Sequence, residues 1–377
     1  MDHATLTTWL GDVADWRREH RRFHGLADIL FLCLCATLCG ADTFTQIAYF
    51  GEARLDWLRR WLPYANGIPS HDTLRRVLQA LDPQVLASLL TRWARAMQQL
   101  TPQQVVSVDG KALRGTWESS GGSGLTLVSL WASEARLCLG VAAVGEKGGE
   151  VAAAQTVLGL LDVAGTILTA DAGFTHKAFA AQVVAREADY VLALRGNQPT
   201  LLAQAESVFA TVGAEQVASY ETQEKNRGRI ETRHCQVTER LGHFGLEAAT
   251  GWAGLRTLVK LDRQRVVRQQ GEWVEQAETR YYLSSLPADA ALHQAVIRQH
   301  WGIENQQHWL LDVVLREDQV RIRSEHAPEN LALCRRIALN LAQAHKPEKI
   351  SFKGALYKAT LSTAMLQQLL FGTQSDA

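Results

Sequence analysis

The sequence predicts an α/β protein with a helical N-terminal domain and a β-rich insertion. Three observations support this prediction. The first hundred residues have helical periodicity, short apolar strands then alternate with helical segments, and strand-like segments follow one another from about residue 218. A chain of 377 residues is long enough for two domains, or for one domain with a large insertion. Apolar residues make up 47% and charged residues 21%, as in ordinary globular proteins with a core.

Residues 1–100 are expected to form a compact helical domain. The segments 26–40, 43–62 and 83–100 have helical periodicity, and another helix is expected near residue 71 with Ser70 or Asp72 as its N-cap. The run "ILFLCLCATLCG" holds three of the six cysteines. Its length of about 12 residues is too short to span a bilayer. We therefore expect reduced core cysteines, no membrane segment and a cytoplasmic location.

Residues 101–345 are expected to form the α/β domain. Three strands come first and favour antiparallel hairpins, whereas two later strands are reached through helices and are expected to be parallel. A β-rich insertion is expected at about 212–286, followed by helices and by a C-terminal tail at 346–377. The expected strands cover 105–108, 125–133, 135–145, 165–173 and 189–197, and those of the insertion cover 218–225, 230–240, 255–267 and 278–286.

Three acidic residues stand at positions where an active site could form. Asp109 and Asp171 each follow an apolar strand, and Glu304 lies in a late helix. In open α/β sheets, sites form beyond the carboxyl ends of strands, so these carboxylates converge if the strands are neighbours. Three carboxylates do not stay ionised together without a cation, and oxygen ligands favour Mg²⁺ or Mn²⁺. Two such ions are the usual device for phosphodiester chemistry.

Other interpretations of the same residues remain open. "VDGK" also fits an Asp-Gly hairpin turn, Asp171 fits a plain loop, and Glu304 fits a solvent-facing helix position. His300 and His308 lie four residues on either side of Glu304, a spacing that also fits a zinc site on one helix face. The order differs from the H-E-x-x-H zinc signature, however. Only the three acids taken together favour the magnesium site.

Several long blocks of the chain match a known family. They include "SVDGKALRG", "LTADAGFTHK", "YVLALRGNQP" and "RQHWGIENQQHWLLDVVLREDQVRIR". The chain resembles the DDE transposases of bacterial insertion sequences, of the H-repeat-associated type. The resemblance implies an RNase H-like core behind a helical associated domain, with Asp109, Asp171 and Glu304 as catalytic triad and metal ligands. It also implies two Mg²⁺ (or Mn²⁺) ions per site.

The resemblance further implies what the protein acts on. A transposase of this type cuts double-stranded DNA at terminal inverted repeats and joins the 3′-hydroxyl ends to target DNA, and a homodimer would hold two ends in a synaptic complex. Two alternatives stay open: a retained DNA-binding protein without transposition activity, and a non-transposing nuclease of the same fold. Better-known relatives carry a Tyr-Arg-Glu-Lys signature around the catalytic glutamate. Here Ile297, His300 and Leu311 stand in place of its Tyr, Arg and Lys, and Arg298, His308 and Arg316 are candidate substitutes.

DNA contacts have to come from local groups of residues, because Lys plus Arg and Asp plus Glu both number 39 and the net charge is zero. Basic residues cluster in the insertion, around residues 225–233 and 256–268. Each such residue also fits a solvated surface charge. The residues that we expect to contact DNA are Lys111, Arg114, Arg195, Asn197, Arg227, Arg229, Arg233, Arg298, His300 and His308.

Overall fold

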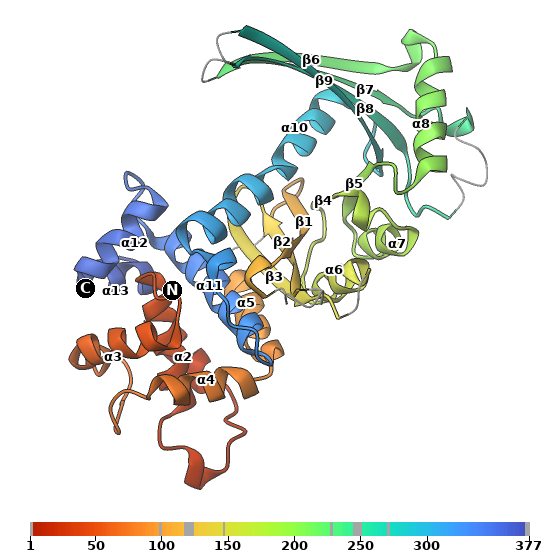
Figure 1. The fold of residues 1–377 in the computed structure, drawn as a ribbon. Helices are drawn as coiled ribbons and strands as arrows, with labels where there is room; N and C mark the ends of the chain where they lie inside the picture. Colours follow the sequence, from red (N-terminus) through yellow and green to blue (C-terminus); the bar gives the residue numbers. More distant parts are fainter. Residues whose placement is uncertain are drawn as a thin grey trace.

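The protein is built around one nine-stranded mixed sheet in the order β3-β2-β1-β4-β5-β9-β8-β7-β6. Helices from both ends of the chain gather beside β3, and the long strands β6 to β9 extend from the opposite side (Figure 1). The sheet and helices confirm the predicted α/β class. The computed structural model describes residues 3–97, 100–116, 124–145, 148–226, 229–243, 251–269 and 272–373.

The N-terminal region is helical, as predicted, and α2 is its centre. Every residue of α2 from Ile29 to Leu38 is buried, which explains the apolar run. All six cysteines are free, and no helix among the described residues is long and apolar enough to cross a membrane. Ser70 caps α4 by accepting a hydrogen bond from the Thr73 amide at 3.3 Å. The helices are α1 (His3–Gly11), α2 (Leu26–Leu38), α3 (Phe44–Leu58), α4 (His71–Ala80) and α5 (Pro83–Met97).

The C-terminal segment folds back onto these helices. Residues 346–377 were expected to form only a tail, but they contain α12 (Phe352–Leu361) and α13 (Thr363–Phe371). The ring of Phe371 lies 4.6 Å from that of Trp61 and 6.4 Å from that of Phe31 (centroid distances). The two ends of the chain therefore share one apolar core, and Figure 1 shows both termini on the same side of the molecule.

The core sheet has the strand order 3-2-1-4-5 of an RNase H-like fold. β1, β2 and β3 pair antiparallel, and β4 and β5 continue parallel to β1. The parallel strands are reached through α6 and α7, as the alternation of strands and helices predicted. The elements are β1 (Val105–Ala112), β2 (Thr126–Ala132), β3 (Leu137–Ala143), α6 (Glu150–Gly159), β4 (Ile167–Ala170), α7 (Lys177–Ala185) and β5 (Asp189–Leu194).

The β-rich insertion continues the core sheet. Its last strand, β9, pairs antiparallel with β5, and β8, β7 and β6 follow outward. β8 and β9 have 13 residues each, so they reach far beyond the core (Figure 1). The elements are α8 (Pro199–Thr211), β6 (Ala218–Asn226), β7 (Arg229–Thr238), β8 (Thr257–Gln269) and β9 (Glu272–Ser284).

Helix α10 (Ala290–His300) crosses one face of this sheet. Its residues Val296 and Ile297 share an apolar cluster with Val105 of β1 and Ile167 of β4. The chain then continues as two π-helical segments, Ile303–His308 and Leu310–Val314, instead of the regular helix that the sequence predicted. π-helical turns are wider than α-helical turns and are frequent at functional sites.

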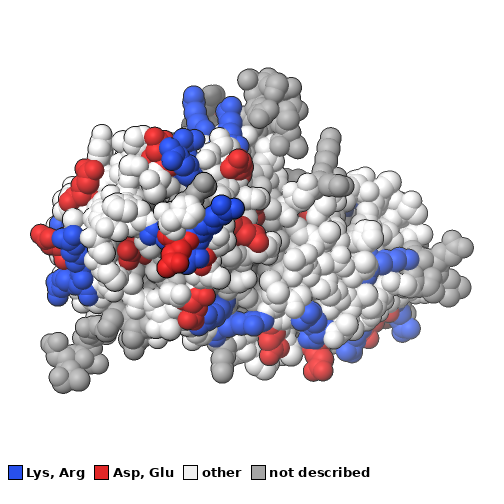
Figure 2. All heavy atoms as spheres, turned by 90° about the horizontal axis from the view of Figure 1, so that it is seen from below, with Lys and Arg blue, Asp and Glu red and all other residues white. Residues whose placement is uncertain are grey.

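On the surface, basic and acidic side chains are mixed. On the face drawn in Figure 2, the Lys and Arg side chains of the described residues lie beside Asp and Glu instead of forming one continuous basic area. This distribution agrees with the zero net charge of the chain. A polyanionic partner therefore has to be recognised at a local site and not by a uniformly basic face.

A long helix, α11 (Ala327–His345), covers the β3 edge of the sheet. The buried Asn340 amide donates to the Cys138 carbonyl of β3 and accepts from the Cys138 amide, both at 2.8 Å. One side chain thus replaces a neighbouring strand at this edge, where unpaired backbone groups would be costly.

We predict that Asn340→Ala lowers the free energy of unfolding by roughly 2–4 kcal/mol, because two buried backbone groups lose their partners. Urea unfolding followed by circular dichroism measures the change. Asn66→Ala is the matched control, since this exposed amide makes one hydrogen bond at the surface, to the Phe23 carbonyl. Equal destabilisation by the two substitutions would contradict the role assigned to Asn340.

Candidate active site

Asp109 and Asp171 lie side by side on neighbouring strands. β1 and β4 pair in parallel up to Val108 opposite Ala170, so each aspartate is the next residue after the last paired position. β1 does not end at Asp109 as predicted, because it stays paired with β2 as far as Ala112. The alternative of a hairpin turn at Asp109 and Gly110 is therefore wrong. The two carboxylates meet where β1 and β4 separate.

A chain of polar side chains fixes the end of α10 against these strands. His300 Nδ1 lies 2.9 Å from the Thr169 hydroxyl, which donates to the Ser107 hydroxyl at 3.2 Å. Ser107 is 3.3 Å from the Ser133 hydroxyl, which in turn lies 3.3 Å from the Gln299 carbonyl. Ser107 and Thr169 each precede a catalytic candidate by two residues and share its face of the sheet. Their contacts fix the position of the C-terminal end of α10 relative to β1 and β4.

The two histidines lie on either side of Glu304, each beside one aspartate. His300 Nε2 is 3.5 Å from an oxygen of Asp171, and His308 Nδ1 is 3.6 Å from an oxygen of Asp109. A hydrogen bond from His300 lowers the pKa of Asp171 against the opposing effect of burial. Burial, Arg336 and Lys111 lower the pKa of His308 to about 3, so this imidazole is neutral at pH 7.

The charge on Asp109 is disfavoured. Burial raises its pKa to about 6, with Asp171 and Glu304 adding to the shift and His300 opposing it. Asp171 and Glu304 are therefore close enough to Asp109 to influence its charge, and the catalytic triad stays a prediction. Among the described residues, no three His, Cys, Asp or Glu side chains are already arranged as a metal-binding group. The chemistry nevertheless fits a divalent cation, because a positive ion would stabilise the charge of Asp109, whose pKa is raised, beside the carboxylate oxygens of Asp171 and Glu304.

Lys111 forms ion pairs inside the protein. Its side chain is 7% exposed, and Nζ lies 2.7 Å from Asp312, 3.0 Å from Asp318 and 3.7 Å from Glu317. Glu317 also accepts a hydrogen bond at 2.7 Å from the fully buried Arg336 of α11. The predicted DNA contact of Lys111 stays a prediction, but this geometry favours a positioning role. None of its carboxylate partners was recognised as a site residue from the sequence.

Three other residues expected to contact DNA have partners within the protein. Arg195 Nη2 is 3.8 Å from Asp171, and Asn197 donates to the Ala172 carbonyl at 2.9 Å. Arg114 is 81% exposed and lies 3.6 Å from Asp318.

Two of the candidate substitutes for the missing signature have partners in the protein. Arg298 on α10 contacts Glu224 of the insertion. Arg316 binds Asp42 at 2.6 Å and the Gly40 carbonyl at 3.2 Å, next to the N-terminal helices. Arg316 thus links the segment that follows Glu304 to the N-terminal helical region.

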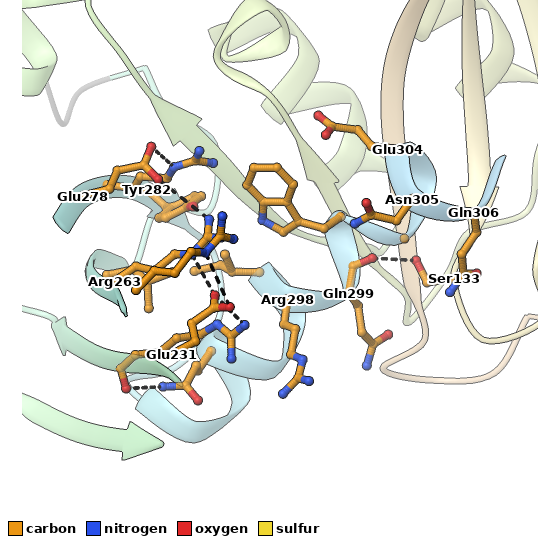
Figure 3. A pocket seen from close by; sticks show the side chains of 18 of the residues that line it. Ser133, Glu231, Arg263, Glu278, Tyr282, Arg298, Gln299, Glu304, Asn305 and Gln306 are labelled. Atoms are coloured by element: carbon orange, nitrogen blue, oxygen red, sulfur yellow. Dashed lines mark hydrogen bonds and ion pairs between the residues drawn. The ribbon is translucent and has the colours of Figure 1, made fainter. Parts of the chain in front are cut away.

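The insertion places further arginines beside Glu304, around a cleft shown in Figure 3. Arg229 and Arg233 of β7 contact Glu231, as do Arg263 and Arg265 from the second basic cluster. Arg280 of β9 also lines the cleft, and no sequence signal marked it as a site residue. Arg227 lies outside the described residues.

Comparison with known proteins agrees with this architecture. Residues 7–94 match the family model described as DDE_Tnp_1-associated, and residues 100–341 match the one described as Transposase DDE domain. The chain is 33% identical to YncI of Escherichia coli O157:H7 over 98% of this chain and 95% of that protein. It is 32% identical to the H repeat-associated protein YhhI of Escherichia coli strain K12 over 99% of both. Both relatives have the word transposase in their names.

A more distant likeness is to a piggyBac transposase in a synaptic complex with hairpin DNA. The TM-score is 0.43 at 13% identity, covering 99% of this chain and 83% of that one. The family assignment does not depend on this likeness. It rests on the two family models and on the full-length relatives, which confirm the resemblance found in the sequence. The chain belongs to the family of transposases with a DDE domain, and its N-terminal helices correspond to the domain associated with that family.

Proposed function

We propose that this protein is an active DNA transposase that cuts at terminal inverted repeats and joins the freed 3′-hydroxyl ends to target DNA. One observation carries the proposal: Asp109 and Asp171 lie on neighbouring strands where β1 and β4 separate, and the charges of Asp171 and Glu304 both add to the effect of burial in raising the pKa of Asp109. Family membership supports the same reaction. The catalytic triad is the part of the proposal that the experiments below address first.

In this proposal the three acids hold two divalent ions, Mg²⁺ or Mn²⁺. When bound, such ions activate an attacking water or 3′-hydroxyl and stabilise the leaving oxygen. Other residues of the chain hold these acids in position. His300 orients Asp171 while Thr169 holds the imidazole, and Lys111 ties the strand of Asp109 to the segment that follows Glu304.

The proposed substrate is double-stranded DNA. Arg195 lies beside Asp171, and arginines of the insertion line the cleft that Glu304 also borders, so guanidinium groups suited to phosphate are present near both acids. Two transposon ends have to be brought together before joining, so we propose a homodimer as the active form. We place this activity in the cytoplasm.

We predict that Asp109→Asn, Asp171→Asn and Glu304→Gln each reduce strand cleavage roughly 10³-fold, because each removes a ligand of ions that contribute several kcal/mol to transition-state stabilisation. The assay is cleavage of a DNA fragment carrying the element's end in the presence of Mg²⁺. Asp162→Asn is the control, because Asp162 is an exposed acid outside the site.

The same assay separates the alternatives. Cleavage by Asp109→Asn or Glu304→Gln at the parental rate would exclude the proposed triad. Binding of the ends without cleavage, even on pre-nicked DNA, would favour a DNA-binding protein without transposition activity. Cleavage without strand joining would favour a nuclease of the same fold.

We predict that Asp109→Asn stabilises the metal-free protein at pH 8. The folded-state pKa of Asp109 is raised to about 6, so the native state binds its proton more tightly than the unfolded chain does. Ionisation therefore costs stability as the pH rises from about 4 to 6, and the cost is complete above that range. The expected gain is roughly 2–3 kcal/mol at pH 8 and close to zero at pH 4.

Urea unfolding in EDTA at both pH values measures this difference, with Asp162→Asn as the exposed control. A variant no more stable than the parent at pH 8 would show that Asp109 is not electrostatically strained.

We predict that Mn²⁺ raises the unfolding temperature of the parent protein, because the ion relieves the repulsion between the carboxylates. A ligand at 100 times its dissociation constant stabilises by about 2.7 kcal/mol. Asp171→Asn and Glu304→Gln should lose most of this effect, whereas Asp162→Asn should keep it. Stabilisation by Zn²⁺ that depends on His300 and His308 but not on Asp109 would instead favour the zinc site.

A further inference from the structure

A cleft of about 600 Å³ lies between the strands of the insertion and the helix that leads to Glu304. Figure 3 shows Glu304 and Asn305 at one side of it and Glu231, Arg263 and Glu278 at the other. Among the described residues, six arginines and four glutamates line the cleft. The arginines are Arg229, Arg233, Arg263, Arg265, Arg280 and Arg298.

Strand register places these charges on one face of the sheet. Glu231 of β7 pairs with Arg265 of β8, Arg233 pairs with Arg263, and Arg263 also pairs with Glu278 of β9. Side chains alternate between the two faces of a strand, so residues two apart on each of these strands point to the same side. That side faces α10, from which Arg298 completes the cleft.

Glu231 is the hub of this group. Its side chain is 5% exposed, and its carboxylate lies 2.7 Å from both Arg233 and Arg263, 3.8 Å from Arg229 and 3.9 Å from Arg265. Glu224 also lies 3.5 Å from Arg233, and Glu278 lies 3.9 Å from Arg263, so the four guanidinium groups face three carboxylates and positive charge remains in excess by one. The Nε of Arg265 is buried and has no hydrogen-bond partner among the described residues. A buried donor without a partner is costly and calls for an acceptor that enters the cleft.

Trp301 fixes two of the guanidinium groups. The Cζ of Arg280 is 4.6 Å from its ring centroid, and the Cζ of Arg263 is 5.9 Å away. Such cation–π contacts hold the arginines in place before a ligand arrives. The cleft therefore recognises its ligand through charge and N–H donors.

We infer that this cleft binds backbone phosphates of a single DNA strand as that strand passes from the carboxylate site. The inference rests on the proposed function and names the part of the substrate that this side of the site holds. Guanidinium groups match phosphate oxygens with paired N–H donors, which lysine does not offer. A volume of about 600 Å³ equals a sphere about 10 Å across, narrower than the ~12 Å major groove of a duplex alone. A single strand can therefore enter the cleft, whereas a whole duplex is too wide to do so.

The test measures how tightly the full chain binds two fluorescein-labelled DNAs. One is a duplex with a single-stranded arm (the forked DNA), and the other is the same duplex without the arm. Binding is followed by fluorescence anisotropy in EDTA at several salt concentrations. The parent is expected to bind the forked DNA more tightly. Arg265→Ala and Arg298→Ala should each weaken forked binding several-fold and make the slope of log K against log salt shallower by about 0.7. Binding of the plain duplex should not change.

Arg256→Ala is the matched control. Arg256 lies immediately before β8, is 53% exposed and pairs with Glu239 outside the cleft, so its loss should leave both DNAs bound as by the parent. Unfolding temperatures of all variants show whether they fold. Arg298 is 54% exposed, so its substitution tests the cleft even if Arg265→Ala is unstable.

An equal loss of affinity for the two DNAs would overturn the inference. So would an unchanged affinity for the forked DNA in both cleft variants. If the parent still cleaves DNA with Mg²⁺ in that case, the proposed function stands without it. A parent that binds neither DNA would overturn both.

Discussion

The structure depends on the need to neutralise Lys111, a buried cation two residues after Asp109. Its partners Asp312, Glu317 and Asp318 all come from the segment that follows Glu304, and Arg336 of α11 supports Glu317. Leaving one such buried charge without its partner costs roughly 3–5 kcal/mol. β1, the π-helical segments and α11 therefore have to meet in one arrangement. The distance between the first and third acids follows from that arrangement.

In contrast to Lys111, Asp109 is a buried group whose charge is only partly compensated. Burial, together with Asp171 and Glu304, raises the pKa of Asp109, although His300 opposes the shift. Strongly perturbed carboxyls are typical of functional sites, where the fold gives up stability for chemistry. The neighbouring polar chain through Thr169 and Ser107 keeps the helix end in place while the acids repel one another. The hydrogen bonds that hold the helix end and the acid whose charge is disfavoured thus lie within a few residues of each other.

The insertion adds a second charged region by extending the same sheet. Because β9 pairs with β5, the arginine-bearing strands continue the layer that carries Asp109 and Asp171, and α10 crosses both parts. Glu231 and its arginines lie on one side of the cleft beside the C-terminal half of this helix, and Glu304 lies on the other side. A separately folded insertion would leave the spacing between these two groups to a flexible connection. A shared sheet fixes it through backbone hydrogen bonds.

The sequence by itself determined the fold class and most strands and helices, and it singled out three candidate acids, because apolar periodicity and strand-end acids are local signals. It also predicted the family, and it predicted a helical cap at Ser70 or Asp72, of which Ser70 is the cap. It did not show that β1 continues past Asp109, that the helix around Glu304 is π-helical, or that Lys111 is buried. Those features depend on partners distant in the sequence, such as the Val108–Ala170 register and the contact of Lys111 with Asp312. Tertiary structure alone decided them, since strand neighbours and charge partners are chosen by packing and not by sequence spacing.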